Sequence, residues 1–179
     1  MRKFIARILR KRGWKISIQT TIPSKCVLCI APHTSNWDFI IAISFYKDIG
    51  GNPHFLMKKD WFFFPIGTLL RSMGGIPVNR SKKSSMSRQM VDLFDCKTDF
   101  QLAIAPEGTR KRNSYWKTGF YHIALAANVP ITLVYLDYNK KEIGAQRIFH
   151  PTGDTEKDIR EIKDYYKDFQ GKHPEKFSI

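Results

Sequence analysis

The sequence contains no apolar run long enough to cross a membrane. A spanning helix needs about 20 consecutive apolar residues, and every apolar run in this 179-residue chain is much shorter. The stretch FIARIL at residues 4–9 is interrupted by Arg7 and is too short for the apolar core of a secretory signal. We therefore expect the chain to stay in the cytoplasm.

Cysteine is also scarce. The chain has three cysteines, which excludes a disulfide framework. Cys26 and Cys29 form a CxxC pair inside an apolar run, without a second pair elsewhere. We favour two buried strand residues over a zinc or redox site, which the same spacing would also allow.

Acidic residues are few. The chain has 16 Asp and Glu but 30 Lys and Arg, so its formal net charge is +14. This balance favours an anionic partner: nucleic acid, a membrane surface or phosphorylated small molecules. The excess is concentrated in the first fifteen residues, which carry seven bases and no acid.

Residues 1–15 predict a short amphipathic helix. On a helical wheel Phe4, Ile5, Ile8 and Leu9 share one side, and most of the bases lie around the other. Such a helix can lie in anionic headgroups as a membrane-surface element. The alternative is a helix that packs on its own domain with solvated bases.

Residues 16–179 have the length of one domain and contain no internal repeat or low-complexity linker. Short apolar runs bounded by Pro, Gly or polar residues predict strands, and they alternate with segments that predict helices. This alternation predicts an α/β fold, a single-domain sandwich with a largely parallel central sheet flanked by helices. Strands are expected at 26–32, 54–58, 75–78, 100–106, 130–138 and 144–150, and helices at 35–49, 61–73, 84–96, 118–129 and 155–169.

Two of the expected strands end in the same way. IAPHT places His33, and IAPEGT places Glu107, within two residues of an apolar run that ends in Ala-Pro. In parallel sheets, ligand sites lie beyond the carboxyl ends of the strands. Both side chains are therefore candidates for a functional site.

Asp38 follows His33 after five residues. Within one regular helix these side chains would point about 140° apart. Pro32 disfavours helix at the residue before it, and the polar residues 34–36 can cap a helix that begins there. His33 then lies in the turn and Asp38 in the first helical turn, where the carboxylate can orient the imidazole as a general base. Taken alone, the pair is also compatible with a histidine that caps a helix or fills a core.

Three further motifs follow along the chain. GGIPVNR ends in Arg80, APEGTRKR carries Glu107, Gly108 and Arg110, and NVPITLVYL places Pro130 ahead of a strand. The guanidinium groups suit phosphate oxygens, and a glycine lets the backbone approach a ligand closely.

HTSNWD, GGIPVNR, PEGTR and VPI, in this order, resemble the four motif blocks of the glycerophospholipid acyltransferase family, which includes the 1-acylglycerol-3-phosphate acyltransferases. The resemblance covers roughly residues 25 to 136. It implies an enzyme of phospholipid synthesis that moves a fatty acyl group from an acyl thioester, either acyl-CoA or acyl-carrier protein, to the free hydroxyl of a lysophospholipid such as 1-acylglycerol-3-phosphate. No metal and no redox cofactor is expected.

The resemblance also implies residue roles. His33 is the general base, and Asp38 orients it. Lys58 and Pro130 are expected at the thioester and acyl site, although Lys58 fits a solvated lysine at a strand end equally well. The residues implied in acceptor binding are Arg80, Glu107, Gly108, Thr109 and Arg110.

Two positions depart from the family pattern. Asn79 replaces the aspartate frequently found before the arginine, and Pro32 replaces a common asparagine before the histidine. Because arginine binds a carboxylate nearly as well as a phosphate, acylation of a lyso-aminolipid or another non-phosphate acceptor is the first alternative. A basic nucleic-acid-binding module is a distant alternative, since only the charge favours it.

The lipid substrates that the resemblance implies are found at or near a bilayer. We therefore expect a protein that is peripheral on the inner face of the cell membrane, with the anionic membrane surface as a partner. The contact is expected from residues 1–15 or from DWFFFP at residues 60–65, where Trp61 suits headgroup depth. The alternative for DWFFFP is an ordinary set of core aromatics.

Overall fold

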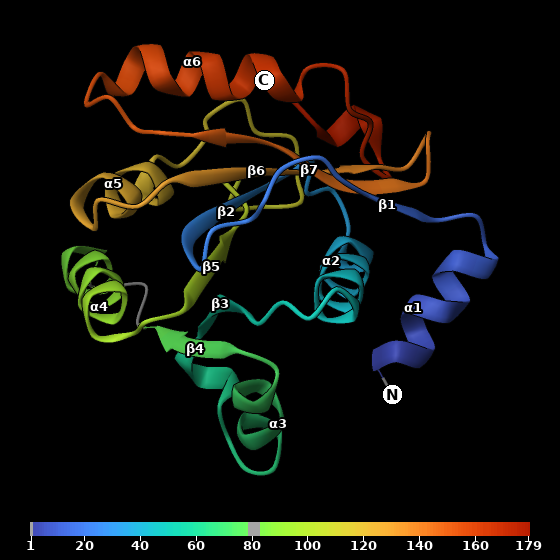
Figure 1. Ribbon diagram of the computed structural model, residues 1–179, viewed down its shortest axis with the longest axis horizontal. Helices are drawn as coiled ribbons and strands as arrows, with labels where there is room; N and C mark the ends of the chain where they lie inside the picture. Colours follow the sequence, from blue (N-terminus) through green and yellow to red (C-terminus); the bar gives the residue numbers. More distant parts are fainter. Residues whose placement is uncertain (1, 79–82) are drawn as a thin grey trace.

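The computed structural model describes residues 2–78 and 83–179. These residues form a seven-stranded sheet of order β1-β7-β6-β2-β5-β3-β4 with helices on both faces (Figure 1). The predicted α/β sandwich with a largely parallel sheet is therefore confirmed. The strands are β1 (Lys15–Ile18), β2 (Lys25–Ala31), β3 (Pro53–Lys58), β4 (Gly75–Val78), β5 (Phe100–Ile104), β6 (Ile131–Asp137) and β7 (Glu142–Phe149).

The described helices connect these strands and cover the sheet. They are α1 (Arg2–Lys11), α2 (Asn36–Asp48), α3 (Ile66–Ser72), α4 (Lys83–Cys96), α5 (Gly119–Ala126) and α6 (Thr155–Tyr166), with 3-10 turns η1 (Lys59–Trp61) and η2 (Pro174–Lys176). In this part of the chain no helix is long and apolar enough to span a bilayer.

Side-chain alternation along the strands divides the core into two layers. Val27 and Cys29 of β2 face a cluster formed with α4, α5 and α6, whereas Cys26 and Leu28 face a cluster formed with α1 and α2. Because successive strand residues point to opposite faces, the strand buries apolar side chains on both sides. This explains why the central strands read as continuous apolar runs rather than as alternating ones.

Cys26 and Cys29 lie in different layers for the same reason. Burial raises the pKa of the Cys26 thiol to about 11 and that of Cys29 to about 12. Thiols that remain protonated on opposite faces of a strand cannot chelate one metal ion or form one disulfide. The interpretation as buried strand residues is correct.

The edge beyond β6 differs from the rest of the sheet. β7 runs antiparallel to β6, and β1 pairs in parallel with β7. The sequence did not lead us to expect β1, which lies directly after the basic segment. The other neighbouring pairs are all parallel, so β2, β3, β4, β5 and β6 end at the same edge of the sheet.

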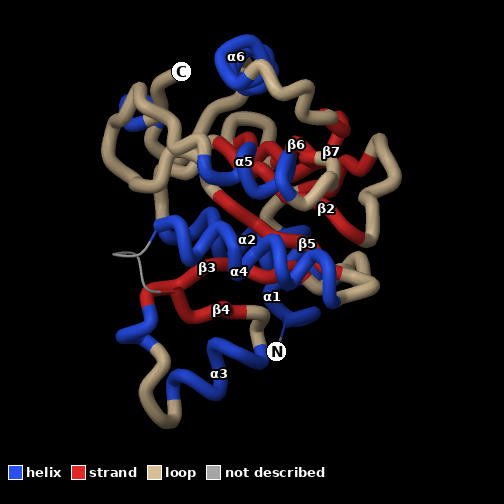
Figure 2. The backbone as a smooth tube through the Cα atoms, turned by 90° about the vertical axis from the view of Figure 1, so that its left-hand side faces the viewer, coloured by secondary structure: helices blue, strands red, loops and turns tan. Residues whose placement is uncertain are grey.

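The helix expected at 61–73 is shorter than predicted. η1 ends at Trp61 and α3 begins only at Ile66, so the aromatic residues between them lie in a connection. Pro65 disfavours the helical conformation at the preceding residue, which accounts for the interruption. Figure 2 shows α3 projecting from the sheet beyond β4 rather than covering one of its faces.

Helix α1 packs on the domain. Ala6 is fully buried, Leu9 packs against the cluster beneath α2, and Arg10 forms an ion pair with Asp48 at 2.6 Å. Arg7 and Lys11 remain exposed. The amphipathic helix predicted for this segment is present, and at least part of its apolar side contacts the protein itself.

Candidate active site

The site begins where β2 ends. Pro32 follows the last strand residue Ala31, and the helix α2 begins at Asn36 with Ser35 as its N-cap. The Ser35 hydroxyl accepts a hydrogen bond from the backbone N–H of Trp37 at 3.2 Å. The expectation of a short turn with a polar cap is confirmed, and it places His33 outside the helix.

Asp38 is the third residue of α2, and its carboxylate points back into the turn. Its Oδ2 atom accepts hydrogen bonds from the backbone N–H groups of Thr34 and Ser35, each at 2.7 Å. The same oxygen lies 3.3 Å from Nδ1 of His33. The side chain of Asp38 is 1% exposed and that of His33 is 22% exposed, so a buried carboxylate faces an imidazole that solvent can reach.

The second oxygen of Asp38 has a different partner. Tyr138, just beyond β6, donates its hydroxyl hydrogen to Oδ1 at 2.6 Å. Both oxygens of the carboxylate are therefore held. The arrangement leaves Nε2 of His33 as the nitrogen directed away from the carboxylate, which is the geometry required of an oriented base.

Glu107 joins the third motif to the first. Its Oε1 atom accepts a hydrogen bond from the backbone N–H of His33 at 2.6 Å. The residue is 1% exposed, and burial raises the pKa of its carboxyl to about 7, although the hydrogen bond from His33 lowers it. The sequence predicted Glu107 in acceptor binding, but in the structure one of its oxygens supports the histidine turn.

Arg110 lies beside the start of α2. Its guanidinium donates a hydrogen bond to the side-chain oxygen of Asn36, and both residues are exposed. Gly108 has a positive φ of 64°, and a Cβ atom there would lie 2.7 Å from the side chain of Lys117. The positive φ favours glycine at this turn, and the turn directs an arginine to the rim of the His33 site.

A segment near the carboxyl terminus closes against the same turn. The backbone N–H of His173 donates to Oγ1 of Thr34 at 3.2 Å, and the ammonium of Lys172 lies 5.5 Å from the ring centre of Trp37. A Cβ atom on Gly171 would lie 2.7 Å from Oγ1 of Thr34. Nothing in the sequence motifs indicated this contact, because the segment contains no recognisable pattern.

The structure does not bring every predicted residue to His33. Lys58 ends β3, two strands away from β2, and its side chain is exposed and paired with Asp60 at 2.6 Å. Pro130 precedes β6 and accepts a hydrogen bond from Val27 near the start of β2, so it lies at the opposite edge of the sheet. Arg80 lies outside the described residues. The acyl-site and acceptor roles of these three residues remain predictions.

The hydroxyl of Thr109 accepts a hydrogen bond from the backbone N–H of Lys111 at 3.2 Å. Thr109 therefore stabilises the turn that carries Arg110. Within the described ranges no cluster of three or more His, Cys, Asp or Glu residues has the arrangement of a metal site.

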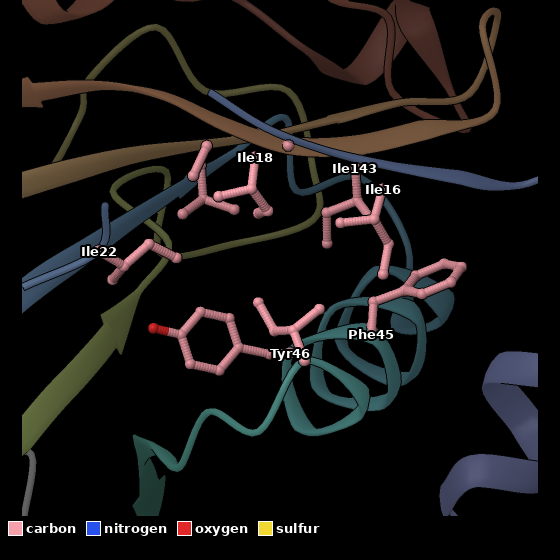
Figure 3. A pocket seen from close by; sticks show the side chains of 10 residues that line it. Ile16, Ile18, Ile22, Phe45, Tyr46 and Ile143 are labelled. Atoms are coloured by element: carbon pink, nitrogen blue, oxygen red, sulfur yellow. The ribbon is translucent and has the colours of Figure 1, made fainter. Parts of the chain in front are cut away.

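An apolar pocket lies elsewhere on the α2 side of the sheet. Figure 3 shows Ile16, Ile18 and Ile143 facing Phe45 and Tyr46 across it. These residues come from β1, β7 and the second half of α2. His33, Asp38 and Glu107 are not among the residues that line it, so the pocket and the histidine site are separate features.

Sequence reasoning missed Tyr138, although a signal for it existed. Tyr138 follows an apolar strand, as His33 and Glu107 do. Since β6 is a parallel neighbour of β2, the rule that ligand sites lie beyond the carboxyl ends of parallel strands applies to Tyr138 as well. The apolar pattern predicts a strand through residue 138, whereas β6 ends at Asp137 and leaves Tyr138 beyond it. The sequence predicts only a capping role for Asn36, whereas its side-chain oxygen accepts a hydrogen bond from Arg110.

The fold and the site define one class of protein. A family model described as Acyltransferase matches residues 14–136, which is more than half of the chain. The chain belongs to the glycerophospholipid acyltransferase family, as the four motifs indicated.

Individual relatives agree with this assignment. The 1-acyl-sn-glycerol-3-phosphate acyltransferase of Escherichia coli (strain K12) is 31% identical over 127 residues, and that of Salmonella typhimurium (strain LT2) is 29% identical over 130 residues. Each match covers 66% of this chain and 50% of the relative, so the chain spans about half the length of these curated relatives.

The fold has a solved counterpart. The crystal structure of the 1-acyl-sn-glycerophosphate (LPA) acyltransferase, PlsC, from Thermotoga maritima superimposes with a TM-score of 0.63 at 17% identity. The match covers 93% of this chain and 75% of that one. At this identity the similarity establishes the fold.

Proposed function

We propose that this protein transfers a fatty acyl group from an acyl thioester to the free hydroxyl of a lysophospholipid of the 1-acylglycerol-3-phosphate type. The observation that carries the proposal is the pairing of His33 Nδ1 with Oδ2 of the buried Asp38 at 3.3 Å, at the carboxyl end of a central parallel strand. The names of the curated relatives support the choice of acceptor.

In this mechanism Nε2 of His33 removes the proton from the acceptor hydroxyl. The resulting oxygen attacks the thioester carbonyl carbon, the C–S bond breaks, and the thiolate leaves with the proton from the imidazolium. Asp38 stabilises the imidazolium charge as it forms. The products are the acylated lipid and a free thiol, with no acyl-enzyme intermediate.

Arg110 and Arg80 are the proposed contacts for the acceptor phosphate. Arg110 is exposed at the rim of the His33 turn beside Asn36, and a guanidinium can bind a phosphate through two hydrogen bonds. Acyl-CoA and acyl-carrier protein both fit as donors, because either provides the thioester.

The surface around α3 supports attachment to a lipid bilayer. Phe64 is 87% exposed and lies in the connection between η1 and α3, which follows β3. Exposed aromatic and aliphatic side chains that gather in one segment are typical of membrane or partner surfaces. The exposed apolar residues of this segment, here called the α3 patch, are Trp61, Phe63, Phe64, Ile66 and Leu69.

Basic side chains lie near the α3 patch and on α1. Lys59 and Arg71 are exposed beside the patch, and Arg7 and Lys11 are exposed on α1. In Figure 1 α1 lies beside α2, and α3 lies beyond β4 at the bottom of the view. Apolar insertion by the α3 patch, with attraction of these bases to anionic headgroups, therefore fits a peripheral protein, and the inner face of the cell membrane remains the predicted location.

The activity is tested with the purified protein, an acyl thioester and a panel of lysolipids. We expect release of free thiol and formation of a diacyl product with lysophosphatidate, using acyl-CoA and acyl-carrier protein in separate reactions. Lyso-aminolipids in the panel test the alternative acceptor class. Absence of transfer to every acceptor with either donor would overturn the proposal.

A further inference from the structure

The turn after β6 supplies a contact to the His33 site that the sequence motifs do not contain. Tyr138 lies 100 positions after Asp38, and its hydroxyl donates to Oδ1 of that carboxylate at 2.6 Å. The residue directly follows β6, which ends at Asp137 and pairs in parallel with β2. The two strands therefore deliver Tyr138 and the His33 turn to the same edge of the sheet.

The two carboxylate oxygens of Asp38 have different partners. Oδ2 accepts hydrogen bonds from the amides of Thr34 and Ser35 and faces His33. Such a capping arrangement needs only residues at the start of the helix. The hydrogen bond from the Tyr138 hydroxyl to Oδ1 does not belong to this capping arrangement. Because the terminal torsion of an aspartate is broad, a second anchor on Oδ1 restricts the rotation that would turn Oδ2 away from the imidazole.

Tyr138 is itself held in place. Its ring packs edge-on against the buried Trp14, with ring centres 5.0 Å apart and an interplanar angle of 88°. Its backbone N–H donates to the carbonyl of Gln170 at 2.8 Å. Burial raises the pKa of Tyr138, and the hydrogen bond to Asp38 raises it further. The hydroxyl therefore keeps its proton at neutral pH and remains a donor.

We propose that Tyr138 is a positioning residue of the acyl-transfer site. It fixes the carboxylate of Asp38 so that neutral His33 carries its proton on Nδ1 and presents Nε2 as the base. The residue acts through Asp38 and does not contact the reacting atoms. The inference rests on the proposed function of His33 as the general base.

The first test is Tyr138→Phe, which keeps the ring against Trp14 and removes only the hydroxyl. We expect kcat to fall by roughly tenfold or more, by analogy with the loss seen when the hydrogen-bond partner of a metal-binding histidine is removed, with KM unchanged for both substrates. The matched control is Tyr165→Phe on α6, which removes another hydroxyl from the core and should leave kcat unchanged. Equal losses in both variants, or a change confined to KM, would contradict the positioning role.

A double-mutant cycle distinguishes positioning from general stabilisation. If Tyr138 acts through Asp38, Tyr138→Phe should have no further effect on kcat in an Asp38→Asn background, because the oriented carboxylate is already lost. A structural role predicts additive effects instead. Additive losses would therefore overturn the inference.

A nitrogen-15 NMR spectrum of the His33 ring separates this inference from the proposed function, because it needs no turnover. With the ring in its neutral form, we expect the wild-type protein to show the Nδ1–H tautomer, and Tyr138→Phe to show a mixture of both tautomers. Failure of acyl transfer in the wild-type protein would overturn the proposed function, while this spectrum would still report whether Tyr138 orients the ring. The same tautomer ratio in both proteins would overturn the inference.

Discussion

Oε1 of Glu107 and the backbone N–H of His33 are joined by a hydrogen bond of 2.6 Å, although the two residues are 74 positions apart in the chain. The carboxylate of the third motif therefore helps to fix the turn of the first. The bond follows from the parallel arrangement of β2 and β5, which end side by side. It gives Glu107 a structural contribution whose pH dependence can be measured.

Glu107→Gln should remove a pH-dependent part of the stability. The pKa of Glu107 is raised from 4.5 to about 7, so between these values the folded state binds more protons than the unfolded state. Its contribution is fully present below pH 4.5 and is lost as the pH rises through 7, by an amount on the order of 3 kcal/mol. Urea unfolding at pH 5 and pH 8 should show that only the wild type loses this amount. Parallel pH dependences of the two proteins would contradict the assignment.

His33→Ala should abolish transfer without unfolding the protein. The side chain is partly exposed, and its backbone N–H still donates to Glu107 after the substitution. We expect a loss in kcat of at least about 100-fold, since a general base contributes about that much or more. His122→Ala on α5 is the control, because His122 is exposed and belongs to no motif. Near-full activity of a folded His33→Ala protein would remove the central proposal.

Arg110→Ala should weaken binding of the acceptor more than binding of the donor. A charged hydrogen bond to phosphate contributes about 1.5–3 kcal/mol, which corresponds to a rise in the acceptor KM of roughly tenfold or more. The neighbouring Arg112→Ala removes the same charge from an exposed position and is the matched control. Separate Michaelis constants for the two substrates decide the matter, and an effect confined to the acyl donor would reverse the assignment.

Gly171→Ala should push the carboxyl-terminal segment away from the His33 turn. The new Cβ would lie 2.7 Å from Oγ1 of Thr34 and 3.2 Å from Cβ of Pro32, and such overpacking costs about 1–3 kcal/mol. Both the free energy of unfolding and kcat should fall. Gly119→Ala, where the added atom would meet nothing within 4 Å, should change neither. If the two variants have the same free energy of unfolding and the same kcat, the carboxyl-terminal segment accommodates the added methyl group without displacing the His33 turn.

Replacing both Phe63 and Phe64 with Ser should weaken binding to lipid vesicles. Burial of a phenylalanine side chain contributes about 1.5–3 kcal/mol, so flotation with anionic vesicles should fall by more than tenfold. Tyr115→Ser, at an exposed aromatic residue outside the α3 patch, is the control. Unchanged flotation of the double variant would assign the contact to another surface.

The basic residues of α1 should contribute the electrostatic part of binding to lipid vesicles. Arg7→Gln with Lys11→Gln should lower binding to anionic vesicles and leave binding to neutral vesicles unchanged, and high salt should have a similar effect. Substitutions are preferable to deletion of the helix, since Ala6 is fully buried. An equal loss on both kinds of vesicle would indicate that the substitutions disturb the fold.

The fold class and the start of the site could be predicted from local patterns in the sequence. The alternation of apolar runs and helical segments defined the parallel sheet, because burial on both faces requires apolar residues at successive strand positions. The spacing from Pro32 to Asp38 likewise defined a turn followed by a capped helix, because capping is a local interaction between residues three or four positions apart. Family membership followed from the order of four motifs.

The distant groups that complete the site could be identified only from the folded structure. Tyr138 on Asp38, Glu107 on His33 and Gly171 against Thr34 join residues far apart in the chain. The folded structure also shows that Pro130 lies at the opposite edge of the sheet and that α1 packs on α2. The physical reason is that local propensity and pattern specify elements and their ends, whereas strand order and helix packing specify which of those ends meet.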